Sequence, residues 1–367
     1  MRRQLTPAFL AEAPQTHWRY LPLLPLPEGV RLPVAPVGWT PVFDAAPLAA
    51  HFGLRAVFLK DEGRNPTASL KDRASSVGAV HAAASGYRES TCASTGNAAS
   101  SLAGMGVQLG LHAYIFVPTQ VSTAKLTQML MYGATVFLVR GTYEDAFRLS
   151  MDAAARFNWY NRNSAINPFL VEGKKTAGLE IAEQTAKAPP DAIVVPLGDG
   201  CTLAGVWKGL HEMHLLGMGP PVPRVIGVQA AGAAPIAAAL AENRDATPVP
   251  VQTLADGIAV GTPRNWRKAL AAVRASDGTI VTVTDEEIMD AMRLLARLTG
   301  VWGEPAALAG VAALPHLRDR GLIGPRERVL VLLTGHGLKD PVTARRAAPG
   351  RAVEIDATPE AVQSALV

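Results

Sequence analysis

Cysteine is nearly absent from the sequence, which has only Cys92 and Cys201 among its 367 residues. Two cysteines cannot form the multi-bridge framework of a small secreted domain, and their positions do not match the spacing of zinc ligands. We therefore predict two free thiols, no metal site and a chain that works in the reducing cytoplasm.

A long apolar run is also lacking. The least polar stretch, residues 225–241, is rich in alanine and contains Gln229 and Pro235, so it falls short of the ~20 strongly apolar residues that span a bilayer. Near the N-terminus, Arg2 and Arg3 precede a polar, proline-rich sequence instead of the apolar core of an export signal. We predict no membrane span and no export.

The sequence has no large excess of one charge, because it contains 35 Lys and Arg and 31 Asp and Glu residues, which gives a net charge of +4. Without a basic stripe or interleaved aromatic residues, nucleic acid is not an expected partner. Gly104, Gly106 and Gly110 miss the spacing of a dinucleotide fingerprint, and no serine stands in a nucleophile elbow. The 49% of hydrophobic residues is enough for a large core and for about two domains.

Short β-branched runs alternate with helix-length segments, which is typical of βαβ units on a parallel sheet and predicts an α/β fold. The expected strands are residues 56–60, 114–117, 135–139, 192–196, 225–228, 279–283 and 329–333. The expected helices include residues 122–131, 143–157, 172–187 and 285–298. Thr284 is the expected N-cap of the last of these helices. Prolines crowd the first ~45 residues, which we expect to form an extended arm.

Four segments place polar or basic side chains where a strand gives way to a helix or turn. Residues 65–73 put Lys71 in a first helical turn, where opposition to the helix dipole lowers the pKa of the amine and favours its nucleophilic form. Residues 94–97 offer hydroxyls, a glycine and an amide at a helix start, where an anion can bind. The glycine-rich turn 196–205 lets backbone N–H groups converge on a phosphate.

The fourth segment, residues 333–341, carries Thr334 and His336 at the C-terminal end of an apolar strand, where ligands gather in open α/β sheets. Each segment alone also fits an ordinary helix cap, a turn or, for residues 71–73, a solvated helix face. In this order, however, the four resemble the threonine synthase branch of the fold type II pyridoxal-phosphate enzymes. The resemblance covers roughly residues 39–341 and is supported by residues 163–176 and 302–307.

The resemblance implies that Lys71 holds pyridoxal 5'-phosphate as a Schiff base and later acts as the base at the substrate α-carbon. Asn97 would bond the cofactor's phenolic oxygen, and Thr334 would face its pyridine nitrogen, where a neutral hydroxyl favours elimination over transamination. The loop that would cradle the cofactor phosphate consists of Gly198, Asp199, Gly200, Cys201 and Thr202. The residues that would bind the substrate are Ser94, Thr95, Asn163 and Ser164.

The resemblance further implies two α/β domains with parallel, helix-flanked sheets and the cofactor in the cleft between them. We expect an N-terminal arm at residues 1–45, a large domain from residues 46–89 and 164–350, a small domain at residues 90–163 and a tail at residues 351–367. The expected partners are a small amino-acid substrate and a second copy of the chain.

Threonine synthases convert O-phospho-L-homoserine and water to L-threonine and phosphate, so this reaction is the leading hypothesis. The family pattern has an arginine, which suits a substrate phosphate, where this chain has Leu170, and Asp199 would repel a phosphate. The basic residues that could substitute are Lys60, Arg162, Lys174 and Lys175. Two alternatives stay open. One is a related β- or γ-elimination or replacement enzyme, such as a threonine or serine dehydratase or a biosynthetic synthase acting on another activated amino acid, which Leu170 and Asp199 favour. The other is a pyridoxal-phosphate carrier or regulatory protein without turnover, against which Lys71 argues.

Overall fold

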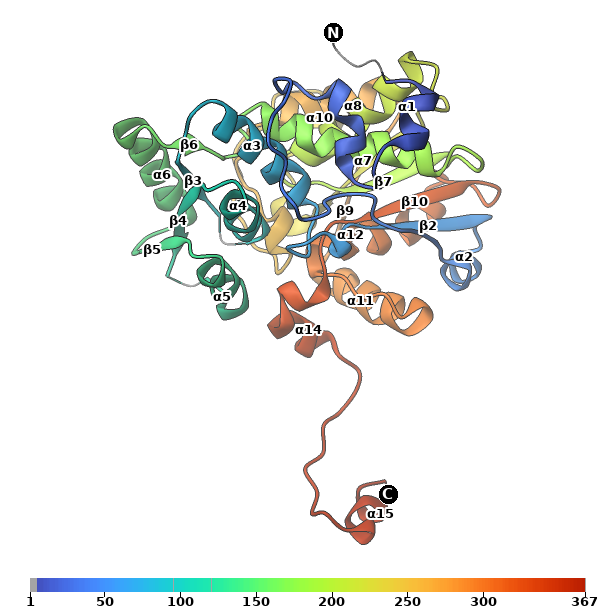
Figure 1. Cartoon of the computed structure of the whole chain (residues 1–367). Helices are drawn as coiled ribbons and strands as arrows, with labels where there is room; N and C mark the ends of the chain where they lie inside the picture. The colour runs from blue at the N-terminus through green and yellow to red at the C-terminus, as the bar shows by residue number, and fades with distance from the viewer. Residues whose placement is uncertain (1–4, 95, 120, 367) are drawn as a thin grey trace.

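The computed structural model describes residues 5–94, 96–119 and 121–366 and organises them around two sheets (Figure 1). The larger sheet has the strand order β1-β2-β10-β7-β8-β9 and is parallel except for the pair β1 and β2. Its strands are β1 Val42–Asp44, β2 Ala56–Asp61, β7 Ala192–Pro196, β8 Arg224–Ala230, β9 Thr279–Val283 and β10 Arg328–Leu333. The α/β prediction is confirmed.

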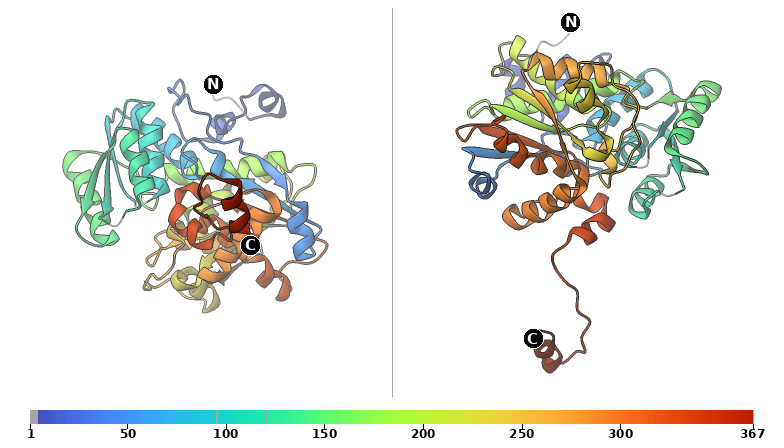
Figure 2. Two further views of the ribbon diagram at one scale, coloured as in Figure 1. Left: turned by 90° about the horizontal axis from the view of Figure 1, so that it is seen from below. Right: turned by 180° about the vertical axis from the view of Figure 1, so that it is seen from behind.

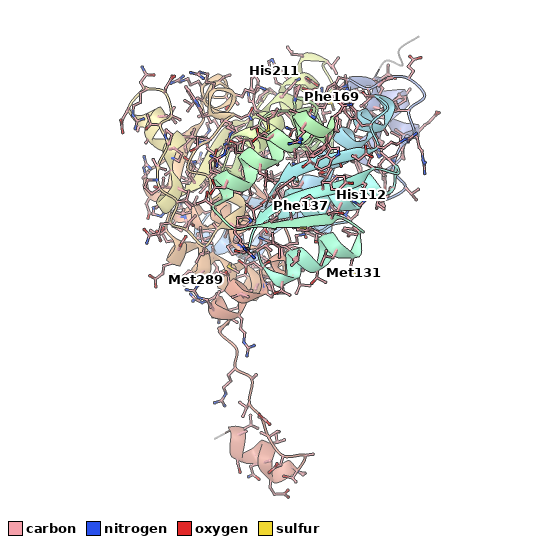
Figure 3. All side chains as sticks on the ribbon, turned by 90° about the vertical axis from the view of Figure 1, so that its left-hand side faces the viewer. His112, Met131, Phe137, Phe169, His211 and Met289 are labelled. Atoms are coloured by element: carbon pink, nitrogen blue, oxygen red, sulfur yellow. The ribbon has the colours of Figure 1, made fainter. Side chains whose placement is uncertain are left out.

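The smaller sheet is wholly parallel and has the order β5-β4-β3-β6. Its strands are β3 Glu89–Ala93, β4 His112–Pro118, β5 Thr135–Val139 and β6 Tyr160–Asn161, and its helices are α4 Asn97–Val107, α5 Thr123–Met131 and α6 Tyr143–Phe157. Ile115 joins a core cluster with α4 and α5, whereas the next residue, Phe116, packs with α6. This alternation covers both faces of the sheet. Figure 3 is viewed from this side and shows Phe137 of β5 and Met131 of α5, both exposed.

The same alternation builds two cores on the faces of the larger sheet, because Val331 packs in one cluster and Leu330 and Leu332 pack in the other. The helices that contribute to the first core are α2 Ala46–Phe52, α11 Asp285–Thr299, α12 Pro305–Ala312, α13 Leu314–Asp319 and α14 Pro341–Ala347. The N-terminal segment adds Leu10 and Tyr20 to the second core, and the other helices that contribute to it are α7 Phe169–Gln184, α8 Cys201–Leu215, α9 Pro235–Ala241 and α10 Trp266–Ala275. Figure 2 shows the two sheets side by side.

The N-terminal segment is not simply extended, so this expectation is wrong in part. It contains α1 Pro7–Glu12 and a 3-10 helix at His17–Leu23. Pro7 stands in the first turn of α1, where its missing N–H costs nothing, and Tyr20 is fully buried. At the C-terminal end, the chain extends away from the two sheets and their helices and ends in the helix α15 Pro359–Leu366 (Figure 1). The proposed domain boundaries stay predictions.

All seven expected strands are present, and the chain adds β1, β3 and β6. The helix expected at residues 172–187 instead spans Phe169–Gln184, directly after Pro168. Thr284 caps α11 as predicted, in a reciprocal capping box with Glu287. Cys92 and Cys201 are free and buried, which confirms the prediction of free thiols. Within the part of the chain that the structure describes, the helices are too short or too polar to cross a membrane.

Candidate active site

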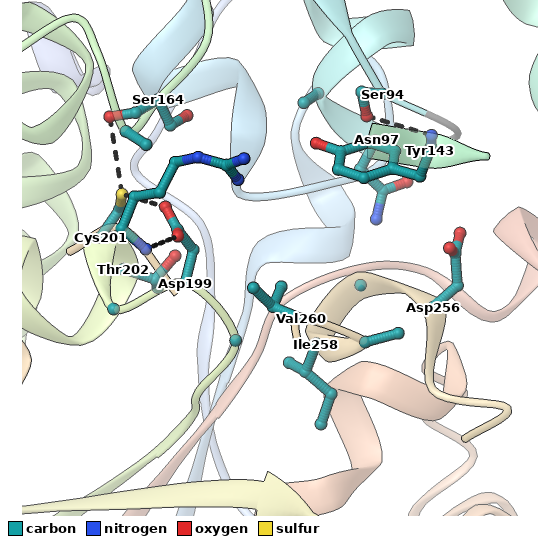
Figure 4. A pocket seen from close by; sticks show the side chains of 18 of the residues that line it. Ser94, Asn97, Tyr143, Ser164, Asp199, Cys201, Thr202, Asp256, Ile258 and Val260 are labelled. Atoms are coloured by element: carbon teal, nitrogen blue, oxygen red, sulfur yellow. Dashed lines mark hydrogen bonds between the residues drawn. The ribbon is translucent and has the colours of Figure 1, made fainter. Parts of the chain in front are cut away.

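A cavity of about 480 Å³ is lined by residues from the elements of both sheets (Figure 4). Figure 4 places Ser94 and Asn97 across the cavity from Asp199 and Cys201. The sequence-predicted site residues that line it are Lys71, Ser94, Asn97, Asn163, Ser164, Gly198, Asp199, Gly200, Cys201, Thr202 and Thr334. Thr95 lies outside the described residues. This volume is in the range of a small-molecule site.

Lys71 is the first residue of helix α3 Lys71–Ala84, and the loop before it is fixed to the end of β10. The N–H of Leu70 donates to the carbonyl of Thr334 at 2.9 Å, and the N–H of His336 donates to the carbonyl of Ala68 at 3.0 Å. The first and fourth sequence segments are therefore paired through their backbones. Ala68 has a left-handed φ of 66°, a strained conformation that residues near functional sites often adopt.

The amine of Lys71 is shielded from bulk solvent but open to the cavity. Burial, followed by the positive charges of Lys174 and Arg162, lowers its pKa to about 8. The lowered pKa was predicted, although burial and like charges are the cause in place of the helix dipole. Among the described residues, the structure records no hydrogen bond or ion pair that would occupy this amine. Lys71 is thus available to a ligand.

Asn97 opens helix α4, and its Nδ2 donates to Oε1 of Glu304 at 2.7 Å. Its Oδ1 is buried and has no hydrogen-bond partner among the residues that the structure describes. Glu304 is buried, and burial raises the pKa of its carboxyl although Lys125 and Asn97 oppose the shift. The N–H of Glu304 donates to the carbonyl of Gly335 at 3.0 Å. Glu304 therefore connects the segment at residues 94–97 to the segment at residues 333–341. Sequence reasoning noted residues 302–307 but missed Glu304 as a site residue.

The glycine-rich turn leads into helix α8, which begins at Cys201. Gly200 has a φ of +100°, and a Cβ there would lie 2.6 Å from the carbonyl oxygen of Asn265, so only glycine fits. Oδ1 of Asp199 accepts from the backbone N–H of Arg264 at 2.6 Å, and Oδ2 accepts from the thiol of Cys201 at 3.2 Å. The carboxylate of Asp199, which was expected to repel a phosphate, therefore stabilises the loop through these two hydrogen bonds.

The predicted substrate-binding side chains differ in their availability. Oδ1 of Asn163 accepts from the N–H of Ala93 at 3.1 Å, and its Nδ2 donates to Oγ of Ser150 at 3.2 Å, so the amide holds β3 against α6. Oγ of Ser164 accepts from Nη1 of Arg162 at 3.0 Å. The role of Asn163 and Ser164 toward a substrate stays a prediction.

Two ion pairs join the helices of the smaller sheet to residues 256–264 at the cavity. Lys125 of α5 pairs with Asp256, and Nη2 of Arg264 lies 2.7 Å from Oε1 of Glu144 on α6. The guanidinium of Arg264 also stacks over the ring of Phe147 at 3.9 Å. These ion pairs could not be predicted from a local sequence pattern, because the two partners of each pair are more than 100 positions apart.

This donor set fits pyridoxal phosphate. The amine of Lys71 can form a bond to a carbonyl carbon, and the turn at residues 198–202 presents the N-terminus of a helix to a phosphate. The unpartnered Oδ1 and second Nδ2 proton of Asn97 can serve the polar edge of a ring, and Thr334 supplies a half-buried hydroxyl in the same cavity. The fold and the site thus define a cofactor-dependent enzyme with a lysine at its centre.

Comparison with known proteins agrees with this definition. The family described as "Pyridoxal-phosphate dependent enzyme" matches residues 35–335, and the chain belongs to this family. A fungal L-serine ammonia-lyase from Rhizomucor miehei shares the fold, with a TM-score of 0.74, 24% identity and coverage of 86% of this chain and 98% of that one.

More similar sequences identify the branch of the family. The chain is 40% identical to a threonine synthase of Methanosarcina acetivorans, over 95% of this chain and 86% of the relative. It is 39% identical to a threonine synthase of Methanocaldococcus jannaschii, over 90% of this chain and 82% of the relative. These relatives assign the chain to the threonine synthase branch, as the sequence segments predicted.

Proposed function

We propose that the chain is a threonine synthase that converts O-phospho-L-homoserine and water to L-threonine and phosphate. The single observation that supports this most is the position of Lys71 in a cavity that Arg162 and Lys174 also line, where burial and these charges lower its pKa to about 8. A lysine of this kind suits proton transfer near neutral pH, and the other two cations suit a phosphorylated substrate. The names of the relatives support the same reaction.

Lys71 has two tasks in this proposal. Its Nζ would hold the cofactor, and the same Nζ would move the protons at the substrate carbons. Pyridoxal phosphate, when bound, supplies a conjugated ring that delocalises electrons from the substrate α-carbon. Because burial and the neighbouring cations disfavour a protonated Lys71, a sizeable fraction of the amine is neutral near pH 8.

The other residues bind and orient. Asn97 would hold the phenolic oxygen of the cofactor, Thr334 would face the pyridine nitrogen, and residues 198–202 would hold the cofactor phosphate. Ser94, Thr95, Asn163 and Ser164 would bind the substrate. The ion pairs of Lys125 and Arg264 would keep the smaller sheet close to the cavity and exclude water from the reacting atoms.

The test is a product assay with the cofactor-loaded enzyme and O-phospho-L-homoserine, followed by amino-acid analysis and phosphate detection. Threonine and phosphate should form in equal amounts, and Lys71→Ala should form neither. Lys187→Ala, which removes an exposed lysine, is the matched control and should retain activity. If the loaded enzyme consumes threonine or O-acetylserine but not O-phospho-L-homoserine, the proposal is wrong and the elimination alternative is correct.

Three further features belong to the same proposal. The family resemblance supports a homodimer, which light scattering after size-exclusion chromatography would test.

The two free cysteines support a cytoplasmic location. The domain boundaries near residues 90 and 163 would be tested by limited proteolysis of the intact enzyme.

A further inference from the structure

Two of the four basic residues that could replace an arginine at position 170 are occupied elsewhere. Lys60 forms a buried ion pair with Glu180. Nζ of Lys175 lies 2.7 Å from Glu172 and 2.9 Å from Glu212. Neither lysine lines the cavity, so neither serves a ligand bound there.

Position 170 itself does not face the cavity. Leu170 is fully buried, and its Cδ2 lies 2.6 Å from the place where a Cβ on Gly78 of α3 would stand. The leucine therefore packs closely against a glycine on the neighbouring helix. In this chain, a cation for a substrate phosphate has to come from another position.

Arg162 and Lys174 line the cavity and are only 1% and 2% exposed. Among the described residues, neither forms an ion pair with a carboxylate, although Asp199 attracts Lys174 from a longer distance. Burial is the main cause that lowers the pKa of both groups, and Arg162 also lowers the pKa of Lys174 and of Lys71. Such a concentration of positive charge is unfavourable until an anion neutralises it.

Arg162 is held in a fixed orientation. Its Nε and Nη2 donate to Oγ of Ser75 at 3.0 and 2.9 Å, and its Nη1 donates to Oγ of Ser164 at 3.0 Å. A guanidinium has five N–H groups, so the second N–H of each Nη atom has no partner in these three bonds. These two N–H groups form no recorded bond to the described part of the chain, and such a pair matches two oxygens of a phosphate.

We infer that Arg162, fixed by Ser75 and Ser164, binds the phosphate of the substrate, with Lys174 adding its charge. The inference rests on the proposed function for the identity of the anion. It makes Arg162 the residue that selects a phosphorylated substrate over one with an acetyl or hydroxyl leaving group. In addition to the contact with the substrate proposed above, the hydroxyl of Ser164 orients this guanidinium.

The test measures binding of inorganic phosphate to the cofactor-loaded enzyme by isothermal titration calorimetry, so that the cofactor's own phosphate site is already filled. Arg162→Gln should weaken phosphate binding about 100-fold and raise KM for O-phospho-L-homoserine by a similar factor, with a smaller effect on kcat. Arg162→Lys, which keeps the charge but loses the fork, should weaken binding about 10-fold. Arg148→Gln, which removes an exposed arginine, should change neither quantity.

The outcomes separate this inference from the proposed function. If Arg162→Gln loads cofactor and binds phosphate as well as the parent, the inference is overturned, even when the parent makes threonine. If phosphate binding depends on Arg162 but the parent makes no threonine, the anion site is supported and the proposed function fails. If Arg162→Gln does not fold, Arg162→Lys decides, and an unchanged phosphate Kd in that variant refutes the inference.

Discussion

Replacing Glu180 by glutamine should cost about 4 kcal/mol of stability, because this carboxylate on α7 is the centre of a buried charge cluster. Its oxygens pair with Lys60 and accept from Nη1 and Nη2 of Arg73 at 2.8 and 2.9 Å. They also accept from the N–H groups of Trp39 and Thr40 at 2.7 and 2.8 Å. The amide of glutamine keeps one acceptor atom and turns the other into a donor.

The size of the effect follows from what the substitution leaves behind. Removing one partner of a buried ion pair costs roughly 3–5 kcal/mol, since the opposite charge stays buried without compensation. The matched control is Asp245→Asn, which removes the acid from an ion pair with Arg267 whose side chains are 72% and 73% exposed. That substitution should cost less than about 1 kcal/mol.

Urea titration followed by far-ultraviolet circular dichroism, at pH 7 and at lower pH, would measure both changes. The cations Arg73 and Lys60 lower the pKa of Glu180 from 4.5 to about 2 against the effect of burial. Because its folded-state pKa is depressed, its contribution is complete above pH 4.5 and is lost as the pH falls toward 2. The Glu180→Gln variant should therefore show a flatter dependence in this range. A loss no larger than that of Asp245→Asn would refute the reasoning.

Other substitutions probe the cavity. Lys71→Ala should abolish the absorbance of the covalently bound cofactor and all turnover, and a variant that works at the parent rate would remove Lys71 from the mechanism. Thr334→Asp should keep the pyridine nitrogen protonated and increase transamination as a side reaction, which keto-acid detection would measure; unchanged product partitioning would count against the placement of Thr334. Leu170→Arg should lower stability by roughly 3 kcal/mol or more, because it buries an unpaired charge against Gly78. An unaltered thermal midpoint in that variant would mean that position 170 reaches solvent or the cavity.

The mutually parallel strands of the larger sheet could be predicted because buried parallel strands are continuous apolar runs, as β10 is at Val329 to Leu333, whereas the short antiparallel β1 was not expected. Strand β3, with the sequence Glu-Ser-Thr-Cys-Ala, has no such run, and β6 has only two residues. Strand β3 pairs with β4, and β6 pairs with β3, and no local pattern in the sequence reveals either pairing.

The four segments that contribute to the cavity were also predictable, since each follows a strand and carries its own local pattern. The contacts that connect them were not, because the Asn97–Glu304 pair joins residues 207 positions apart. The reading of residues 71–73 as a solvated face is wrong, since Asp72 and Arg73 are fully buried. Their partners, such as Thr67 and Glu62, become visible only in three dimensions.

The position of β10 has a consequence for how the protein is made. This strand lies between β2 and β7, yet it ends at Leu333, after more than nine-tenths of the 367 residues. During synthesis, the smaller sheet can form once residue 161 has left the ribosome. The edges of β2 and β7 that pair with β10 stay unpaired until β10 has been synthesised. Thr334, which accepts the hydrogen bond from Leu70, is also synthesised only at this late stage. A shortened chain that lacks β10 therefore cannot complete the larger sheet or fix the loop before Lys71.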